Sequence, residues 1–324
     1  MTKVETREDV AAWQRAAVAQ ATAAAWHRLG LFERLRSGPV PRAELGLDPR
    51  ALAVTVPILI HVGLIVADGD ALKLSPAGAR LLQEGALPTD RTLEMLRDLS
   101  RLPDVLREGG PVKDEQGRSR GTRGGTRVDR PEETETFLEG LYRLSAEASK
   151  LTFEHLAPGL PARGAVLDLG GGHGRYARAF ADAGFAVTLF DQPEVVQLAK
   201  KRHGAVLRYL EGDFHEVADF GGPYDLVLLC NIVHGETAEA NASLVQRAAR
   251  SLRPGGRLAI RDNFMDDEND GPARAVFFGM TMLLYTEGQS PTLAQVERWF
   301  EAAGLTGARV DVVGMQRVAV ARRP

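Results

Sequence analysis

The stretch AVLDLGGGHG, residues 165–174, decides the fold. Its apolar first half predicts a buried strand over Ala165–Leu169, and a helical pattern follows the glycines. Glycines at such a junction let a ligand lie against bare backbone, beside the N-terminal amides of the helix. Gly170 and Gly172 fit the GxGxxG spacing of dinucleotide folds, but Arg175 occupies the third glycine position. The glycine spacing is GxGxG instead. Because one glycine turn is weak evidence for a particular cofactor, the type of site must be inferred from the neighbouring segments.

Downstream of this turn, apolar runs alternate with helical patterns, which is typical of a parallel α/β sheet. The further strands that we predict are Ala186–Phe190, Val206–Leu210, Leu226–Cys230, Arg257–Ile260, Ala308–Val313 and Gln316–Ala321. The predicted helices between them are Arg175–Ala183, Pro193–Lys201, Ala238–Leu252, Pro272–Leu284 and Leu293–Ala303. The C-terminal half is therefore expected to be a Rossmann-like α/β domain.

Residues suited to binding a nucleoside stand where these strands end. Asp191 follows the second strand, about 20 residues after the glycine turn, where an acid can accept hydrogen bonds from both hydroxyls of a ribose. Asp213 and Phe214 follow the third strand, where the carboxylate can accept from an adenine amino group and the ring can stack on the base. His234 follows the fourth strand. Because open α/β sheets bind ligands at the carboxyl ends of their strands, these residues indicate one shared site.

These stretches resemble the class I S-adenosylmethionine (SAM)-dependent methyltransferases. The resemblance is closest to the O-methyltransferases with a winged-helix dimerisation domain, which include caffeate-type, acetylserotonin and bacterial natural-product enzymes. It is carried by VLDLGGGHGRYARAF, LFDQPEVV, EGDF, YDLVLLCNIVH, SLRPGGRLAIRD and MLLYTEG. It implies SAM as cofactor and S-adenosylhomocysteine as coproduct. The cofactor-binding residues that it implies are Asp168, Gly170, Gly172, Asp191, Asp213, Phe214 and Asn231.

The same resemblance assigns an acid–base pair. His234 stands at the position of the family's general base, and Asp262, at the end of the fifth strand, at that of its acidic partner. Ionising a phenol of pKa ~10 at pH 7 costs about 4 kcal/mol, so a base at the hydroxyl helps the transfer. The helix that contains Phe278 and Met282 is expected to line the acceptor pocket, where a soft Met side chain suits a flat substrate. Met282 as ordinary core filling is an equal alternative.

The sequence departs from the plant enzymes at three places near this pair. The second acid of the family is replaced by Ser290, the usual Asp-Trp after the histidine is Gly235-Glu236, and a common lysine is Cys230. Either Glu236 or Ser290 could take over the role of the missing acid. Because the departures concern deprotonation rather than cofactor binding, methylation at carbon or nitrogen stays open. So does a repurposed, non-methylating enzyme of decarboxylase or cyclase type.

The N-terminal half predicts a smaller, mainly helical domain. An alanine-rich helix is expected over Arg7–Leu35, and its small residues suit close packing, either in a core or between subunits. The following order, a short helix at Pro41–Leu45, a helix at Pro49–His61 and a hairpin around Asp68-Gly69-Asp70, is a winged-helix pattern. The would-be recognition helix is mostly apolar after Arg50, so a SAM-sensing DNA-binding regulator is a minor alternative.

Composition limits the partners. The net charge of −3 and pI near 6.2 give no global basic field for nucleic acid or for an anionic membrane. Cys230 is the only cysteine, and no signal-peptide pattern, membrane span or metal motif appears, so a cytoplasmic protein without a metal is expected. The Gly/Arg-rich segment 109–130 predicts an interdomain loop, with an RNA contact or a substrate lid as alternatives.

Together these observations predict three parts. Residues 1–100 form the winged-helix dimerisation domain, 101–155 a linker with the Gly/Arg loop and a helix over Glu133–His155, and 156–324 the SAM-binding domain. We expect a homodimer that transfers a methyl group from SAM to a small aromatic or polyketide-type acceptor, at a hydroxyl oxygen, with His234 as base.

Overall fold

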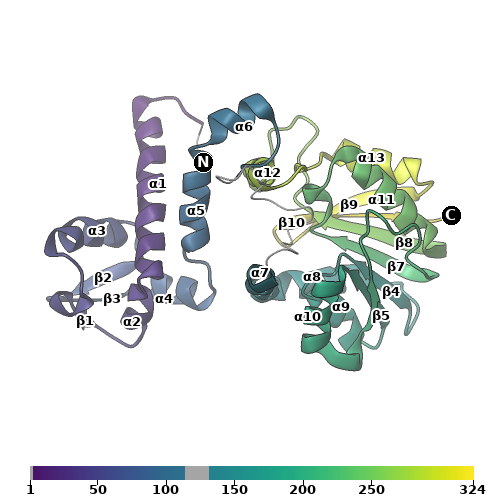
Figure 1. Ribbon diagram of the computed structural model, residues 1–324, viewed down its shortest axis with the longest axis horizontal. Coiled ribbons are helices and arrows are strands. Elements are labelled where there is room, and N and C mark those ends of the chain that lie inside the picture. The colour runs from purple at the N-terminus through teal and green to yellow at the C-terminus, as the bar shows by residue number, and fades with distance from the viewer. Residues whose placement is uncertain (1–2, 114–130) are drawn as a thin grey trace. The chain divides into compact units, whose positions relative to one another are not determined.

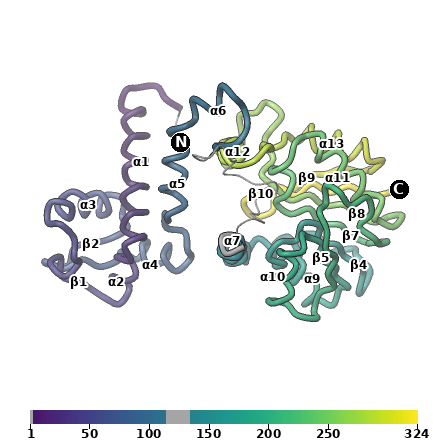
Figure 2. The backbone as a smooth tube through the Cα atoms, in the orientation of Figure 1, coloured from purple at the N-terminus to yellow at the C-terminus, as the bar shows by residue number. Residues whose placement is uncertain are grey.

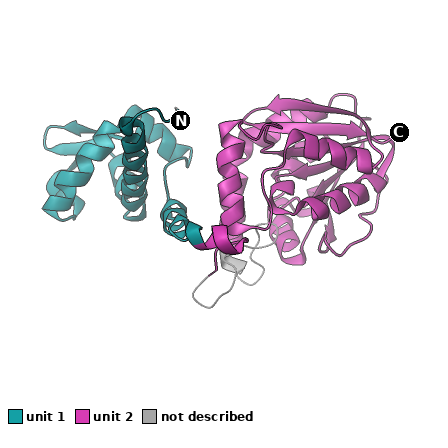
Figure 3. Ribbon diagram, turned by 90° about the horizontal axis from the view of Figure 1, so that it is seen from above, with its two compact units in different colours: residues 1–103 teal, residues 104–324 magenta. Residues whose placement is uncertain are grey.

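The computed structural model describes residues 3–113 and 131–324 of the chain. The chain forms two compact units, Met1–Pro103 and Asp104–Pro324 (Figure 3). Within the described ranges, no helix is long and apolar enough to cross a membrane. Most of the predicted Gly/Arg loop, residues 114–130, lies outside the described residues. The three-part division predicted above stays a proposal about which segments fold independently.

Unit 1 begins with two helices where the sequence predicts one. Helix α1 spans Arg7–Arg28 and helix α2 spans Leu31–Arg36. The prediction of one helix over Arg7–Leu35 is wrong because Gly30 adopts φ +68°, a left-handed conformation that ends the α-helical path. A capping box fixes the start of α1, since the Thr6 side chain accepts from the backbone N–H of Asp9, whose carboxylate accepts from the N–H of Thr6 in return.

The rest of unit 1 has the predicted winged-helix order. Helix α3 (Pro49–His61) precedes strands β2 (Ile65–Asp68) and β3 (Ala71–Leu74), and the short strand β1 (Val40–Pro41) completes a sheet of order β1-β3-β2. The short helix expected over Pro41–Leu45 is a single 3-10 turn, Arg42–Leu45.

Further helices of this part of the chain are α4 (Pro76–Gln83), α5 (Asp90–Leu99) and α6 (Leu102–Glu108). The sequence pattern did not reveal α5, which packs against α1, or α6, whose residues span the boundary between the units. Leu52, Val56 and Leu59 of α3 are buried, as the apolar pattern of that helix predicts.

Unit 2 is built on a seven-stranded sheet of order β6-β5-β4-β7-β8-β10-β9. The five parallel strands are β4 (Ala165–Leu169), β5 (Ala186–Asp191), β6 (Arg208–Glu211), β7 (Tyr224–Cys230) and β8 (Leu252–Asp262). Strand β10 (Gln316–Arg322) runs antiparallel to both β8 and β9 (Thr306–Val313), and these last strands are yellow in Figure 2. The parallel α/β prediction is confirmed, and each predicted strand is present within a few residues.

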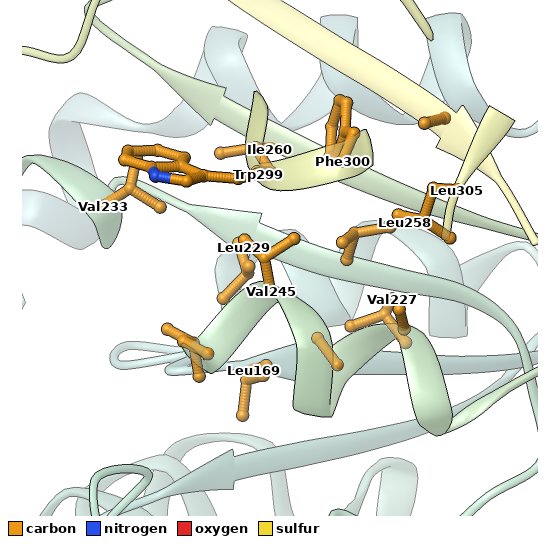
Figure 4. Packing of buried hydrophobic residues seen from close by; sticks show 14 of the residues in the cluster. Leu169, Val227, Leu229, Val233, Val245, Leu258, Ile260, Trp299, Phe300 and Leu305 are labelled. Carbon is orange, nitrogen blue, oxygen red and sulfur yellow. The ribbon is translucent and has the colours of Figure 1, made fainter. Parts of the chain in front are cut away.

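Helices cover both faces of this sheet (Figure 1). On one face pack α8 (Ala146–Leu156), α9 (Arg175–Asp182) and α10 (Pro193–His203), and on the other α11 (Ala238–Arg250) and α13 (Leu293–Ala302). Figure 4 shows the second face, where Val245, Trp299 and Phe300 lie over apolar strand residues. Each fully buried side chain of this size contributes roughly 1.5–3 kcal/mol of transfer free energy. A rigid sheet thus carries the loops at its carboxyl edge.

Two other helices of unit 2 border that edge. Helix α12 spans Ala273–Tyr285, close to the predicted range. The single helix predicted over Glu133–His155 is two helices, α7 (Pro131–Leu144) and α8, separated at Ser145. The Ser145 hydroxyl donates to the carbonyl of Tyr142 at 3.2 Å, a local bond of the kind that competes with helix continuation.

Candidate active site

The glycine turn between β4 and α9 has the conformation that its sequence requires. Gly170, Gly172 and Gly174 have φ values of +71°, +53° and +72°, which side-chain-bearing residues rarely adopt. The amides of Gly170 and Gly171 donate to the carbonyl of Phe190, at 2.8 and 3.1 Å, which fixes the turn to the end of β5. The turn therefore brings bare backbone to the N-terminus of α9, as a ligand site at this edge requires.

Asp191, the last residue of β5, is joined to this turn. One carboxylate oxygen accepts from the backbone N–H of Gly172 at 2.8 Å and the other from Gln192 at 2.8 Å. Burial raises the pKa of Asp191 to about 6, against the lowering effect of these two N–H groups. A carboxylate at this place has the acceptor chemistry that ribose hydroxyls require.

Asp168 lies beneath the same turn and is 1 % exposed. One of its oxygens accepts from the N–H of Ala177 at 3.0 Å, whereas the other has no hydrogen-bond partner among the described residues. Burial raises the pKa of Asp168 to about 7. A buried acceptor with an unused oxygen fits the ammonium group of the methionine part of SAM, so the residues present here suit that cofactor.

The loop after β6 holds the two residues expected at the adenine. Asp213 accepts from the N–H of His215 at 2.8 Å, which orders the loop, and Phe214 is half-buried against the core. Arg247 of α11 donates to the backbone carbonyls of Phe214 and Val217, so the loop is also fixed to a helix.

Asn231, directly after β7, has a left-handed backbone with φ +58°. Its side-chain oxygen accepts from Gln316 at 2.7 Å, and its amide nitrogen lies 3.4 Å from the hydroxyl of Tyr176. Its own N–H donates to the carbonyl of Arg261 at 2.8 Å. Asn231 thus ends β7 at the same edge as the glycine turn, where the sequence predicts a cofactor contact.

His234 and Asp262 are in contact. The single turn η4 (Val233–Gly235) places Nδ1 of His234 2.7 Å from Oδ1 of Asp262, and the backbone N–H of His234 lies 3.3 Å from Oδ2. Asp262 is fully buried, while the imidazole keeps 17 % of its surface exposed. When Nδ1 carries the proton that it donates to Asp262, Nε2 is left with a lone pair. The sequence predicted both residues, and the fold brings them together across 28 positions.

Phe278 borders His234 from α12. Its ring meets the imidazole edge to face, with 4.8 Å between centroids and an interplanar angle of 90°. Met282 lies one turn further along α12 and is 7 % exposed. Of the two residues predicted for the acceptor pocket, Phe278 is therefore the one in contact with His234.

The two candidates for the missing acid have partners elsewhere in the fold. Ser290 is fully buried and its hydroxyl donates to the carbonyl of Ala275 at 2.8 Å. Glu236 lies 3.4 Å from Nε2 of His215, in the loop after β6. No sequence pattern predicts this pair, because a His and a Glu 21 positions apart are common in any chain.

Gly288 is a further residue that the sequence analysis missed. A Cβ at this position would lie 2.2 Å from the carbonyl oxygen of His234 and 2.6 Å from the nitrogen of Glu236. Only glycine allows the loop after α12 to approach the His234 turn so closely. The local signal, a Gly in EGQSP, is indistinguishable from an ordinary turn glycine.

In the described part of the chain, no group of three or more His, Cys, Asp or Glu side chains is arranged to hold a metal ion. The site consists of a glycine turn, carboxylates at strand ends, a hydrogen-bonded His–Asp pair and an aromatic ring.

Comparison with known proteins gives the same picture. Residues 100–306 match the family model described as the O-methyltransferase domain. The chain is 27 % identical over 321 residues to tetracenomycin polyketide synthesis 8-O-methyl transferase TcmO of Streptomyces glaucescens, covering 91 % of each chain. It is 28 % identical over 315 residues to acetylserotonin O-methyltransferase of Mus musculus, covering 87 % of this chain and 79 % of that protein. The structure of human N-acetylserotonin methyltransferase in complex with SAM has the same fold, with a TM-score of 0.79, 21 % identity and coverage of 100 % and 99 %.

Proposed function

Because this chain belongs to the O-methyltransferase domain family and is a SAM-dependent O-methyltransferase, we propose that it methylates a hydroxyl of a small aromatic or polyketide-type acceptor, with His234 as general base. The observation that carries the proposal is the 2.7 Å contact between Nδ1 of His234 and the buried carboxylate of Asp262. This contact leaves Nε2 as the proton acceptor at a partly exposed position.

In this proposal, SAM supplies a methyl group activated by a sulfonium. The backbone of Gly170 and Gly172 would hold it closely, and the carboxylate of Asp191 would accept from its ribose hydroxyls. The unused oxygen of Asp168 would receive the ammonium group. Asp213 and Phe214 would hold the adenine, and Asn231 the methionine part. The main catalytic contribution is positioning, since holding the reactants in line removes much of the entropic barrier.

The proton of the acceptor hydroxyl would pass to Nε2 of His234, and SAM, when bound, would supply the methyl group to the acceptor oxygen with S-adenosylhomocysteine as coproduct. Asp262 keeps the imidazole in the correct tautomer and stabilises the imidazolium that forms. The imidazolium then releases the proton to solvent through its exposed edge, because 17 % of the side chain surface is accessible. His234 thereby supplies the deprotonation that costs about 4 kcal/mol for an unassisted phenol at pH 7.

The acceptor class rests on two features. The Phe278 ring stands perpendicular to His234, so a flat acceptor whose hydroxyl reaches Nε2 lies against an aromatic wall. Met282, on the same helix as Phe278, adds a polarizable side chain. TcmO, a methyltransferase of tetracenomycin polyketide synthesis, is similar to this chain over 91 % of its length.

The test is incubation with methyl-deuterated SAM and a panel of phenols, hydroxyquinones, amines and carbon acids, read by mass spectrometry. We expect label on a phenolic oxygen, and loss of most of that product in His234→Ala. Label on nitrogen or carbon alone would support the alternative acceptors instead. Consumption of a substrate without S-adenosylhomocysteine would indicate a repurposed fold.

We also propose a homodimer formed through unit 1. Several apolar side chains of α1 are exposed in the single chain, among them Trp13 at 46 % and Val18 at 53 %. Light scattering should give twice the chain mass for the native protein, and Trp13→Glu with Val18→Glu should shift it toward the monomer. A monomeric native protein would contradict the proposal.

We place the enzyme in the cytoplasm, without a nucleic-acid or membrane partner. The net charge of −3 and the single cysteine support this assignment. If the pure protein bound duplex DNA in a salt-dependent way, the result would favour the alternative of a DNA-binding regulator.

A further inference from the structure

A half-buried histidine and a buried glutamate connect two loops that the proposed mechanism treats separately. Nε2 of His215 lies 3.4 Å from Oε2 of Glu236, and their side chains are 21 % and 6 % exposed. His215 belongs to the loop after β6, and Glu236 directly follows the turn that carries His234. The pair therefore joins the expected adenine site to the expected base.

On the cofactor side, His215 is part of the structure that shapes the loop. Its N–H donates to Asp213 at 2.8 Å, and its ring lies 4.5 Å from that of Phe214, at 40° between planes. Any displacement of Phe214 or Asp213 is thus passed to the His215 ring, because the three residues share one short, hydrogen-bonded segment.

On the base side, Glu236 is held at the backbone on two sides. The Asn241 side chain donates to the carbonyls of Val233 and Glu236, at 2.8 and 3.3 Å. Gly288 packs against the same turn from the loop after α12. A force on the Glu236 side chain therefore acts on a segment that also includes His234.

The pair has the energetic character needed to couple the loops. A carboxylate with 6 % exposure has lost most of its hydration, so a partner such as an imidazole at ion-pair distance restrains its position. Because the side chains come from different loops, the 3.4 Å approach between them is made only when both loops hold these positions.

We propose that Glu236 is a positioning residue which, through His215, couples cofactor binding on the Phe214 loop to the orientation of His234. This inference rests on the proposed function, because it needs SAM at Phe214 and His234 as base. Glu236 takes no proton from the acceptor. When the cofactor orders the loop that contains Phe214, the contact between His215 and Glu236 also orders the turn that carries His234.

The first test needs no acceptor. Hydrogen–deuterium exchange is measured with and without S-adenosylhomocysteine, on peptides covering residues 211–218 and 231–238. In the wild-type protein we expect the ligand to slow exchange in both. In Glu236→Gln and in His215→Phe we expect protection of 211–218 to persist and protection of 231–238 to be lost. Equal protection of both peptides in the variants would overturn the proposal.

The second test separates positioning from binding. Glu236→Gln should lower kcat by between about fivefold and a hundredfold, the usual range of coupling between sites, with a smaller change in the Kd for SAM. Glu236→Asp should recover part of the loss, and the double variant with His215→Phe should lose no more than either single one. Glu239→Gln, the same change at an exposed position in the first turn of α11, is the matched control.

The outcomes distinguish the inference from its premise. If calorimetry shows no binding of S-adenosylhomocysteine to the wild-type protein, the proposed cofactor site is wrong and the coupling falls with it. If the ligand binds and His234→Ala abolishes turnover, but Glu236→Gln keeps wild-type kcat, only the coupling is wrong. Thermal unfolding of each variant identifies a loss that comes from misfolding.

Discussion

Asp191 accepts a hydrogen bond from the backbone N–H of Gly172 at 2.8 Å, so the end of β5 and the glycine turn form one connected surface. The ribose-binding carboxylate and the turn that approaches the cofactor are thus positioned by each other. The pKa of this carboxylate, raised to about 6 by burial, makes its charge sensitive to mild acid.

The first prediction follows from that pKa. Above pH 6 Asp191 is ionised and accepts from ribose hydroxyls, and below pH 6 it takes up a proton and loses acceptor capacity. We expect the Kd for S-adenosylhomocysteine, measured by calorimetry, to rise as pH falls from 7.5 to 5. Asp191→Asn should weaken binding by roughly 10–100-fold, the value of one charged hydrogen bond, and reduce this pH dependence to the part contributed by Asp168, whose pKa is about 7. A pH-independent wild-type Kd would contradict the assignment.

A second prediction concerns stability and Asp168. Its folded pKa of about 7 lies above the ordinary value of 3.8, so the folded state binds more protons than the unfolded state between these values. Stability contributed by the protonated form is therefore present at low pH and is lost as pH rises from 3.8 through 7. The full shift corresponds to on the order of 4 kcal/mol.

Chemical denaturation of the cofactor-free protein at pH 5.5 and 7.5 tests this. We expect a smaller free energy of unfolding at pH 7.5 for the wild type, and a smaller difference between the two pH values in Asp168→Asn. The Asp191 carboxyl acts in the same direction through its own raised pKa, so part of the difference should persist in that variant.

The third prediction separates the two roles of the His–Asp pair. Asp262→Asn keeps the side-chain shape but replaces an acceptor-only carboxylate with an amide, which no longer fixes Nδ1 as the protonated nitrogen. We expect kcat to fall roughly a hundredfold or more, within the range that acid–base catalysis contributes, with little change in the Kd for SAM. An acceptor of lower pKa should reduce the defect. A variant that is equally impaired with acidic and ordinary phenols would argue against a role in proton transfer.

The fourth prediction tests the approach of Gly288 to the His234 turn. Gly288→Ala places a methyl group 2.2 Å from a backbone oxygen that cannot rotate away. We expect a loss of about 1–3 kcal/mol in stability, typical of overpacking, together with reduced kcat. Gly279→Ala is the matched control, because a Cβ there meets only the Ser290 hydroxyl, at 3.9 Å, and the position is helical. That control should keep or raise the unfolding temperature, so an equal loss in both variants would contradict the packing argument.

The extent to which the sequence predicts this molecule differs between elements for physical reasons. Strands β4 and β7 are almost fully buried and are apolar except for Asp168 and Asp225, so their positions can be found from pattern alone. The break between α1 and α2 is hidden because residues that favour helix stand on both sides of Gly30. The few apolar residues of helix α5 stand among charged ones, so the sequence pattern of this helix is weak. The contact with α1 is known only from the fold.

The residues of the site also differ in whether the sequence predicts them. Gly170, Gly172, Asp191, His234 and Asp262 stand at strand ends, where the chain order itself predicts convergence. The His215–Glu236 pair and the Gly288 approach depend on the path of loops, which no periodicity specifies. The sequence could name Glu236 as an unusual residue, but only the fold gives it a partner.

The strand order has a consequence for synthesis of the chain. Asp262 ends β8, and the neighbour of β8 on one side is β10, which is translated more than fifty residues later. A nascent chain that has not yet produced residues 316–322 leaves that edge of β8 without its partner strand. The carboxylate that orients His234 therefore reaches its final surroundings only after almost all of the sheet has left the ribosome, although the glycine turn and Asp191 can assemble much earlier.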